Sequence, residues 1–177
     1  MDQDFEQKVK KKRLRAIVIA VVLIALAGYV VYDLTAAKHT REITVTVSID
    51  CSTLAADMSK LEDAALEDYV PSDGVILPPT EVKIEEGESA YDALYKICRK
   101  KDIHMEASFT PAYNSYYVEG INYLYEFDAG DLSGWMFNVN GEFPSYGCSE
   151  YVLKEGDAVQ WLYTCDLGKD VGNEFEE

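Results

Sequence analysis

An uncharged apolar segment near the N-terminus constrains this chain more than any other feature. Residues 16–32 read AIVIAVVLIALAGYVVY, and Leu14 extends the apolar run. As a helix, such a segment nearly spans the ~30 Å hydrocarbon core of a bilayer. Six basic residues precede it, and short basic flanks stay on the cytoplasmic side. The pattern predicts a transmembrane helix over residues 16–33, behind a basic cytoplasmic tail at residues 1–15.

A cleaved signal peptide is the alternative explanation of this segment. The apolar region of a signal peptide is ordinarily about 7–15 residues long, so the length favours an uncleaved anchor. Thr35, Ala36 and Ala37 nevertheless resemble a small-residue cleavage site. Under either interpretation the rest of the chain is exported. We expect a single-pass protein of the cell membrane with a cytoplasmic N-terminus and an extracellular C-terminal domain.

Past the apolar segment the chain is strongly acidic. Beyond residue 32 it contains ten Lys or Arg and 29 Asp or Glu, a net charge of about −19. Such a surface repels polyanions, so we expect no nucleic-acid partner. A solvated exterior and a surface that attracts cations or basic partners both stay open. Glu126, Asp128 and Asp131 are candidate ligands for a hard cation, although their spacing matches no calcium loop.

Sequence periodicity predicts an α+β domain over residues 43–168, between a linker at 34–42 and an acidic tail at 169–177. A mixed sheet that holds one main helix, as in a β-grasp fold, fits the order of its elements. Asn140-Gly141 predicts a type I′ hairpin turn. Helices are expected over residues 52–69 and 90–101, and strands over residues 43–49, 80–84, 104–109, 134–139, 151–153 and 158–164.

All four cysteines lie in the exported part of the chain, where disulfides persist. Cys148 and Cys165 flank an expected hairpin at nearly equal distances from its turn, which predicts a disulfide between them. Cys51 and Cys98 then form the second expected pair, because a β-grasp fold brings the end of the first strand near the main helix. Four free, buried thiols are the alternative. No CxxC motif is present to indicate a zinc ribbon or a thioredoxin-type site.

The sequence contains no motif of a known enzyme class. GxSxG, HExxH, GxGxxG and the P-loop pattern do not occur. The two histidines are His39, beside the apolar segment, and His104, after the main helix. Many carboxylates are present, but a catalytic pair depends on a separation in space that sequence does not supply. We expect a binding protein and not an enzyme.

Three segments of the exported domain resemble a known family when they are taken together. They are GESAYDALYKICRKKDI at 87–103, YVEGIN at 117–122, and SGWMFNVNGEFPSYGCSEYVLKEGDAVQWLYT at 133–164. The set resembles the C-terminal domain shared by transcobalamin and intrinsic factor. It is more similar to the bacterial exported domains of unknown function that are grouped with that domain. The resemblance implies a β-grasp-like fold.

The resemblance also implies cobalamin or a related corrinoid as a ligand, with no other cofactor. In the vitamin carriers this domain closes over cobalamin against a separate helical domain, which these 177 residues do not contain. A corrinoid would therefore stay open on one side. By analogy, the candidate contacts are six aromatic residues, Tyr113, Tyr117, Trp135, Phe137, Phe143 and Tyr146.

Core packing is an alternative role for the aromatic residues. Trp161 is expected in the core, and Trp135 fits either role. Two other functions also stay open. One is a surface module that contacts another protein or a cell-wall polymer through a Tyr-rich face. The other is an acidic domain that binds divalent cations.

Overall fold

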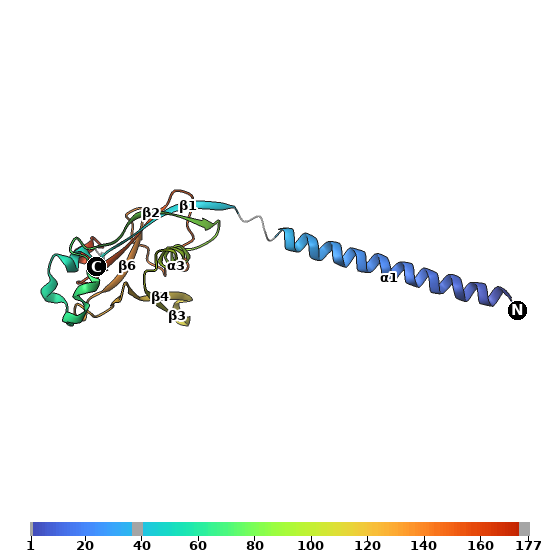
Figure 1. Ribbon diagram of the computed structural model, residues 1–177, viewed down its shortest axis with the longest axis horizontal. Helices are drawn as coiled ribbons and strands as arrows, with labels where there is room; N and C mark the ends of the chain where they lie inside the picture. Colours follow the sequence, from blue (N-terminus) through green and yellow to red (C-terminus); the bar gives the residue numbers. More distant parts are fainter. Residues whose placement is uncertain (1, 37–40, 174–177) are drawn as a thin grey trace. The chain divides into compact units, whose positions relative to one another are not determined.

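The computed structural model describes residues 2–36 and 41–173, and the chain divides into two compact units, residues 1–40 and 41–177. The first unit is helix α1, Asp2–Ala36 (Figure 1). Its segment Lys10–Tyr32 is long and apolar enough to cross a membrane, by length and composition alone. A signal sequence near the N-terminus meets the same criterion. The orientation of this helix and the side of the membrane on which the domain lies stay predictions.

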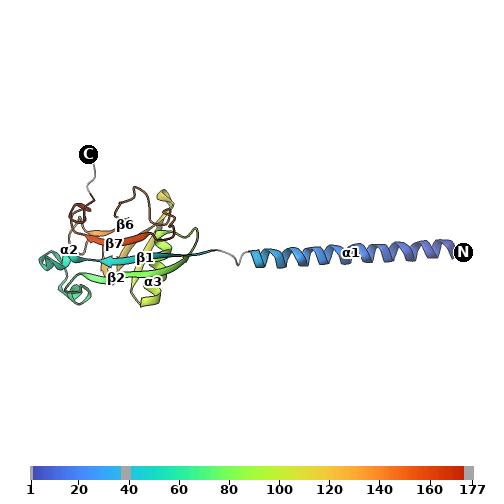
Figure 2. The same ribbon diagram turned by 90° about the horizontal axis from the view of Figure 1, so that it is seen from above.

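The second unit is built on a four-stranded mixed sheet. Its strands are β1 (Glu42–Asp50), β2 (Val75–Glu85), β6 (Gly134–Val139) and β7 (Ala158–Thr164). The order is β2-β1-β7-β6, and Figure 2 shows these strands side by side. Strand β1 runs antiparallel to β2 and parallel to β7, which pairs antiparallel with β6. The strands expected at 43–49, 134–139 and 158–164 are confirmed.

Strand β2 is longer than the expected segment 80–84. It begins at Val75 and runs through Pro78 and Pro79. These prolines are tolerated because β2 lies at the edge of the sheet, where one side of the strand needs no ladder hydrogen bonds.

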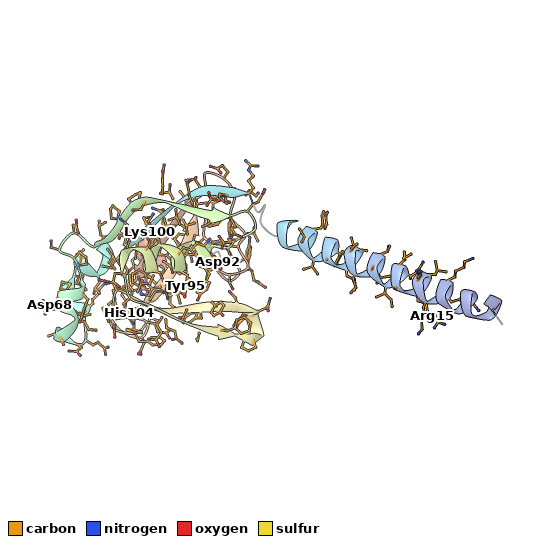
Figure 3. The ribbon with its side chains drawn as sticks, turned by 45° about the vertical axis from the view of Figure 1, so that its right-hand side comes forward. Arg15, Asp68, Asp92, Tyr95, Lys100 and His104 are labelled. Carbon is orange, nitrogen blue, oxygen red and sulfur yellow. The ribbon has the colours of Figure 1, made fainter. Side chains whose placement is uncertain are left out.

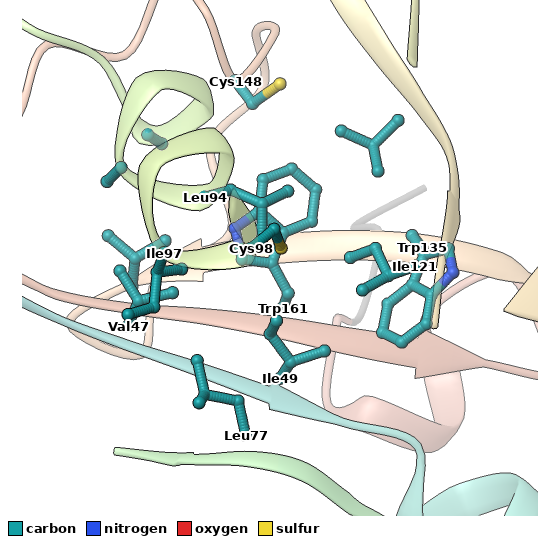
Figure 4. Packing of buried hydrophobic residues seen from close by; sticks show 14 of the residues in the cluster. Val47, Ile49, Leu77, Leu94, Ile97, Cys98, Ile121, Trp135, Cys148 and Trp161 are labelled. Carbon is teal, nitrogen blue, oxygen red and sulfur yellow. The ribbon is translucent and has the colours of Figure 1, made fainter. Parts of the chain in front are cut away.

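The main helix, α3 (Ala90–Lys101), packs against this sheet. Its first turn is closed by a capping box. Ser89 Oγ accepts from Asp92 N at 3.3 Å, and Asp92 Oδ2 accepts from Ser89 N at 2.8 Å. The buried stripe of the helix points towards Val47 and Trp161 of the sheet (Figure 4). One helix held by a mixed sheet confirms the α+β, β-grasp-like class. The buried stripe consists of Ala90, Ala93, Leu94, Ile97 and Cys98.

A second, smaller antiparallel sheet completes the domain. It consists of β3 (Met105–Thr110), β4 (Ser115–Ile121) and β5 (Leu124–Tyr125), in the order β3-β4-β5. Only β3 was expected from the sequence. Its neighbours come from the Tyr-rich stretch, in which Asn122 and Tyr123 take left-handed conformations, φ 55° and 64°, to form the turn between β4 and β5.

The single helix expected over residues 52–69 is wrong. The structure has a short helix α2 (Ser52–Ala55) and two 3-10 turns, Met58–Lys60 and Ala64–Tyr69. Asp57 Oδ1 accepts from Ser59 Oγ, and Asp63 Oδ1 accepts from Ala65 N. Such local bonds between side chain and neighbouring residues compete with a continuous helix.

Both predicted disulfides are also wrong, because all four cysteines are free. The pairing of Cys148 with Cys165 assumed that residues 151–153 form a strand opposite β7. Instead, Ala90 N donates to Tyr151 O at 2.9 Å, and Val152 bridges Ser89. The segment 151–153 therefore runs beside the start of α3.

The other expected pair, Cys51 and Cys98, lies inside the apolar core as free thiols. Cys51 directly follows β1, and Cys98 lies in the last turns of α3. Burial raises the pKa of both thiols to about 12. The same cause raises the pKa of Cys148 to about 12. These three side chains behave as small neutral core residues.

Candidate ligand-binding groove

A groove lined by aromatic side chains lies between β4, β6 and the loop 143–148. It consists of two adjoining cavities of about 200 Å³ and about 400 Å³. We call the two together the aromatic groove. Five residues line both cavities: Tyr116, Tyr117, Met136, Pro144 and Gly147.

All six aromatic residues singled out in the sequence line this groove. The smaller cavity is lined by Tyr117, Trp135, Phe137 and Phe143. The larger is lined by Tyr113, Tyr117 and Tyr146. The fold thus brings together residues from β4, β6 and two connecting segments. Ligand binding by these residues stays a prediction.

Several further lining residues were not foreseen, among them Tyr116, Val118 and Met136. Tyr116 and Val118 lie on β4, which the sequence patterns did not predict as a strand. Met136 lies between Trp135 and Phe137 on β6. The alternation of Ser115, Val118 and Ile121 as buried positions is irregular, because a register shift interrupts the ladder of β3 and β4. The sequence of β4 therefore lacks the regular alternation of apolar and polar residues from which a strand is predicted.

Trp135 belongs to both the core and the groove wall. Its side chain is 7% exposed, and its indole N–H donates to Leu124 O at 2.8 Å. The ring also packs edge-on against Tyr163, with 5.2 Å between ring centroids. The hydrogen bond ties β6 to β5, and the ring contact ties β6 to β7.

Phe137 and Trp161 form the floor of the smaller cavity. Their rings stack with 5.4 Å between centroids. Trp161 is 2% exposed, which confirms its expected place in the core. Its Nε1 is buried without a hydrogen-bond partner among the described residues, unlike Trp135 Nε1.

Tyr117 is held at the rim of the groove by Glu126. Its phenolic O–H donates to Glu126 Oε2 at 2.6 Å. Burial, together with this bond and the negative charge of Glu126, raises the pKa of Tyr117 above its ordinary range. The phenol therefore stays neutral, and its O–H is already used as a donor to Glu126.

The three carboxylates considered as cation ligands do not converge. Glu126 accepts from Tyr117, and Asp128 Oδ2 accepts from Tyr125 N at 2.6 Å. Asp131 is exposed. Within residues 2–36 and 41–173, no group of three or more His, Cys, Asp or Glu is placed to hold a metal ion.

Aromatic stacking extends the groove wall to the main helix. Tyr116 stacks on Tyr91 with 4.3 Å between centroids and 4° between planes, and Tyr91 stacks in turn on Tyr95. Tyr95 and Asp92 project from α3 in Figure 3, and His104 follows the end of this helix. On its other side, Tyr116 meets Phe109 edge-on at 5.4 Å. The stacked rings link α3 with the smaller sheet beside the groove.

Comparison with known proteins finds similarity to one family of domains and to solved structures. A family described as a domain of unknown function, DUF4430, matches residues 87–164, from the start of α3 to the end of β7. No curated protein sequence matches the chain. These boundaries enclose the whole aromatic groove except Asn173, which lines the larger cavity.

Two solved structures are similar to this chain to different degrees. The crystal structure of haptocorrin in complex with Cbi is 17% identical, with a TM-score of 0.52. The likeness covers 72% of this chain and 26% of the haptocorrin chain. It supports the transcobalamin-like fold expected from the sequence. A Ruminococcus gnavus ATCC 29149 protein described in terms of metal binding is 12% identical, with a TM-score of 0.37, over 70% of this chain and 96% of that chain.

Proposed function

We propose that this chain is a membrane-anchored, extracytoplasmic module that binds a corrinoid in the aromatic groove, without catalysis. The observation that carries this proposal is the convergence of the six candidate aromatic residues on two adjoining cavities. Concave sites with mostly apolar walls and a few polar groups are typical of small-molecule binding. The fold shared with haptocorrin supports the choice of ligand class.

The chemistry of the groove suits a large, flat, partly apolar ligand. The rings of Phe143, Trp135 and Phe137 offer apolar surface in the smaller cavity. Hydroxyl groups of Tyr113 and Tyr146 border the larger cavity and can bind polar substituents. Cavities of about 200 and 400 Å³ enclose only part of a corrin ring, so one side of the ligand faces outward. We therefore expect weaker binding than in a closed, two-domain carrier.

Membrane attachment would keep this groove at the cell surface. The helix Lys10–Tyr32 supports an anchor by its length and composition. The basic residues before it support a cytoplasmic N-terminus. In intact cells, external protease should remove the domain and leave the N-terminal tail protected. Protection of the domain, or its release into the medium without protease, would contradict the anchored arrangement.

Calorimetric titration of the full chain in mild detergent with cobalamin tests the ligand. We expect saturable binding that weakens in Phe143→Ala and Tyr146→Ala. Tyr69→Ala is the matched control, because Tyr69 packs against Tyr123 with tilted rings and lines neither cavity. Unchanged binding in both groove variants would mean that cobalamin binds at another site. No detectable heat of binding at high protein concentration would contradict the corrinoid proposal.

A surface module for a protein or cell-wall partner is the second candidate function. It is favoured by large aromatic side chains that stay exposed around the groove. Tyr113 is 75% exposed, Tyr146 50% and Phe109 49%. Exposed apolar groups that cluster in this way mark interaction surfaces. Binding of isolated cell wall that is lost in Tyr113→Ala, with no cobalamin binding, would favour this alternative.

A further inference from the structure

The outer edge of β6 is open at Phe137, where it faces the aromatic groove. Strand β6 ends the four-stranded sheet. In an antiparallel ladder, successive residues direct their backbone N–H and C=O alternately towards the partner and away from it. Val139 exchanges both backbone hydrogen bonds with Glu142, at 2.9 and 3.1 Å. The backbone N–H and C=O of Val139 therefore point away from β7. Phe137, two residues earlier, therefore presents its backbone to the same outer side.

On its side away from β3, strand β4 pairs with β5 at Gly120 and Ile121 and is open at Val118, across the groove from β6. Tyr116 N donates to Ser149 Oγ at 2.9 Å, and Tyr116 O accepts from Cys148 Sγ at 3.3 Å. Both bonds leave β4 on the side away from β3. Val118, two residues further on, directs its backbone to that side by the same alternation.

Phe137 and Val118 both line the smaller cavity, so the two open edges meet there. In the described part of the chain, neither residue has a backbone hydrogen bond outside the two ladders. Backbone groups beside apolar walls need partners, and an unpaired edge is a template for another strand.

We propose that the aromatic groove binds an extended peptide segment of a partner protein, which adds as a strand to β6 at Phe137. The peptide backbone would exchange hydrogen bonds with Phe137 N–H and C=O. Its alternate side chains would contact the aromatic walls. Strand addition of this kind takes affinity from the main chain and specificity from side-chain pockets. The inference rests on the proposed use of the groove as a binding site, and not on the identity of the corrinoid.

Charge defines the partner segment further. The residues that line both cavities are uncharged, and no Lys or Arg is among them. Glu126 and Glu119 lie close enough to Tyr117 to raise its pKa, and Glu142 pairs with Val139 at the end of β6. Acidic groups therefore flank an apolar groove. The complementary peptide is apolar at its centre and basic at both ends.

Peptide probes test this inference on the full chain in mild detergent. The probe is the blocked peptide RKVTVTVKR, and its binding is followed by the fluorescence of the two groove tryptophans. We expect saturable binding. Two versions with N-methyl groups on alternate central residues should differ, because only one set of amides faces β6. The version that blocks that set should bind about tenfold more weakly or worse, as expected for lost hydrogen bonds. The acidic peptide EEVTVTVEE should not bind.

A pair of protein variants tests the same edge. Phe137→Pro removes an N–H that the β7 ladder does not use, and proline is accepted at an outward-facing position of an edge strand. Phe137→Leu keeps this N–H and loses the aromatic ring. We expect peptide binding to weaken in Phe137→Leu, which loses an aromatic wall contact but keeps the N–H, and to be lost in Phe137→Pro. If Phe137→Pro does not fold, the N-methylated peptides give the answer on the unchanged protein.

The outcomes separate this inference from the corrinoid proposal. Cobalamin binding without peptide binding would overturn strand addition and leave the proposed ligand intact. Equal affinity for the two N-methylated peptides and the unmodified peptide would also overturn strand addition. Equal affinity for the basic and acidic probes would overturn it as well. Peptide binding without cobalamin binding would support strand addition and remove the corrinoid. Displacement of one ligand by the other would support both, at one groove.

Discussion

Tyr117 and Glu126 join strand β4 to the segment just after β5 through a hydrogen bond of 2.6 Å. The two residues are nine positions apart, and the turn between β4 and β5 brings them together. The bond fixes the ring of Tyr117 at the rim shared by both cavities. A residue predicted to touch ligand is thus held in place by one that the sequence suggested as a cation ligand.

This bond predicts the titration of Tyr117. Ionisation of the phenol would break the bond and place two negative charges side by side, in addition to the cost of burial. Glu126→Gln keeps the size of the side chain and removes the charge. We expect the pKa of Tyr117 to fall in Glu126→Gln while staying above its ordinary value of about 10. Absorbance at alkaline pH, with Tyr117→Phe subtracted, measures it, and an unchanged pKa would contradict the assignment.

The two tryptophans of the groove predict different costs for the same substitution. Trp135→Phe removes the hydrogen bond from the indole N–H to Leu124 O, which costs about 0.5–1.5 kcal/mol beyond lost packing. Trp161→Phe removes an N–H that has no partner among the described residues. We expect Trp135→Phe to lower the free energy of unfolding more than Trp161→Phe, as measured by urea denaturation. Equal losses would show that the bond to Leu124 contributes little.

Local patterns were sufficient to predict the elements that bury one regular face. The alternation of Ile43, Val45 and Val47 predicted β1, since all three are buried. The Ser89 cap predicted the start of α3, and its capping box is present. The six aromatic residues were predicted as candidate ligand contacts by analogy with the family that the chain resembles, and the fold brings them together at one groove.

Features that depend on distant packing were not predictable in the same way. The segment 151–153 has the pattern of a strand, yet it pairs with residues 88–90 at the start of α3. The disulfide predicted between Cys148 and Cys165 was wrong because it assumed that residues 151–153 pair with β7. Strand β4 was missed because a register shift breaks its period. The pairing partner and register of these segments are determined by tertiary contacts, which outweigh local propensity.

Free cysteines lead to a prediction about thiol reactivity. In denaturant, Ellman's reagent should detect four thiols per chain, with no prior reduction. In the folded protein at neutral pH, Cys51, Cys98 and Cys148 should be protected by burial, and half-buried Cys165 should react first. Alkylation followed by peptide mapping identifies the site. Fewer than four thiols in denaturant would contradict this prediction and indicate a disulfide in residues 41–177.

Burial of the thiols also predicts how stability depends on pH. The pKa of Cys98 is raised from 9.0 to about 12 in the folded protein. Below pH 9 the thiol is neutral in both states, and its full contribution is present. Between pH 9 and 12 only the unfolded chain ionises at this position, so stability is lost as pH rises. We expect the free energy of unfolding to fall less steeply above pH 9 in Cys98→Ala than in the unchanged protein. Parallel pH profiles would contradict a buried neutral thiol.

Gly147 and Ser115 predict a coupled pair at the groove. A Cβ at Gly147 would lie 2.0 Å from Ser115 Oγ and 2.3 Å from Ser115 Cβ, so only glycine lets the loop 143–148 approach β4 this closely. Gly147→Ala should therefore push the loop outward, destabilise the domain by about 1–3 kcal/mol and weaken ligand binding.

The steric cause of this effect can be isolated with Ser115→Gly, which removes both clashing atoms and leaves Ser115 Cα at 3.8 Å. Alone, Ser115→Gly costs stability, because the hydrogen bond to Ser149 Oγ at 2.9 Å is lost and a strand gains a glycine. In the double variant, however, the new methyl group has room. We expect its loss of unfolding free energy to be smaller than the two single losses together by more than about 0.5 kcal/mol. Additive losses would mean that another contact of the loop sets the shape of the groove.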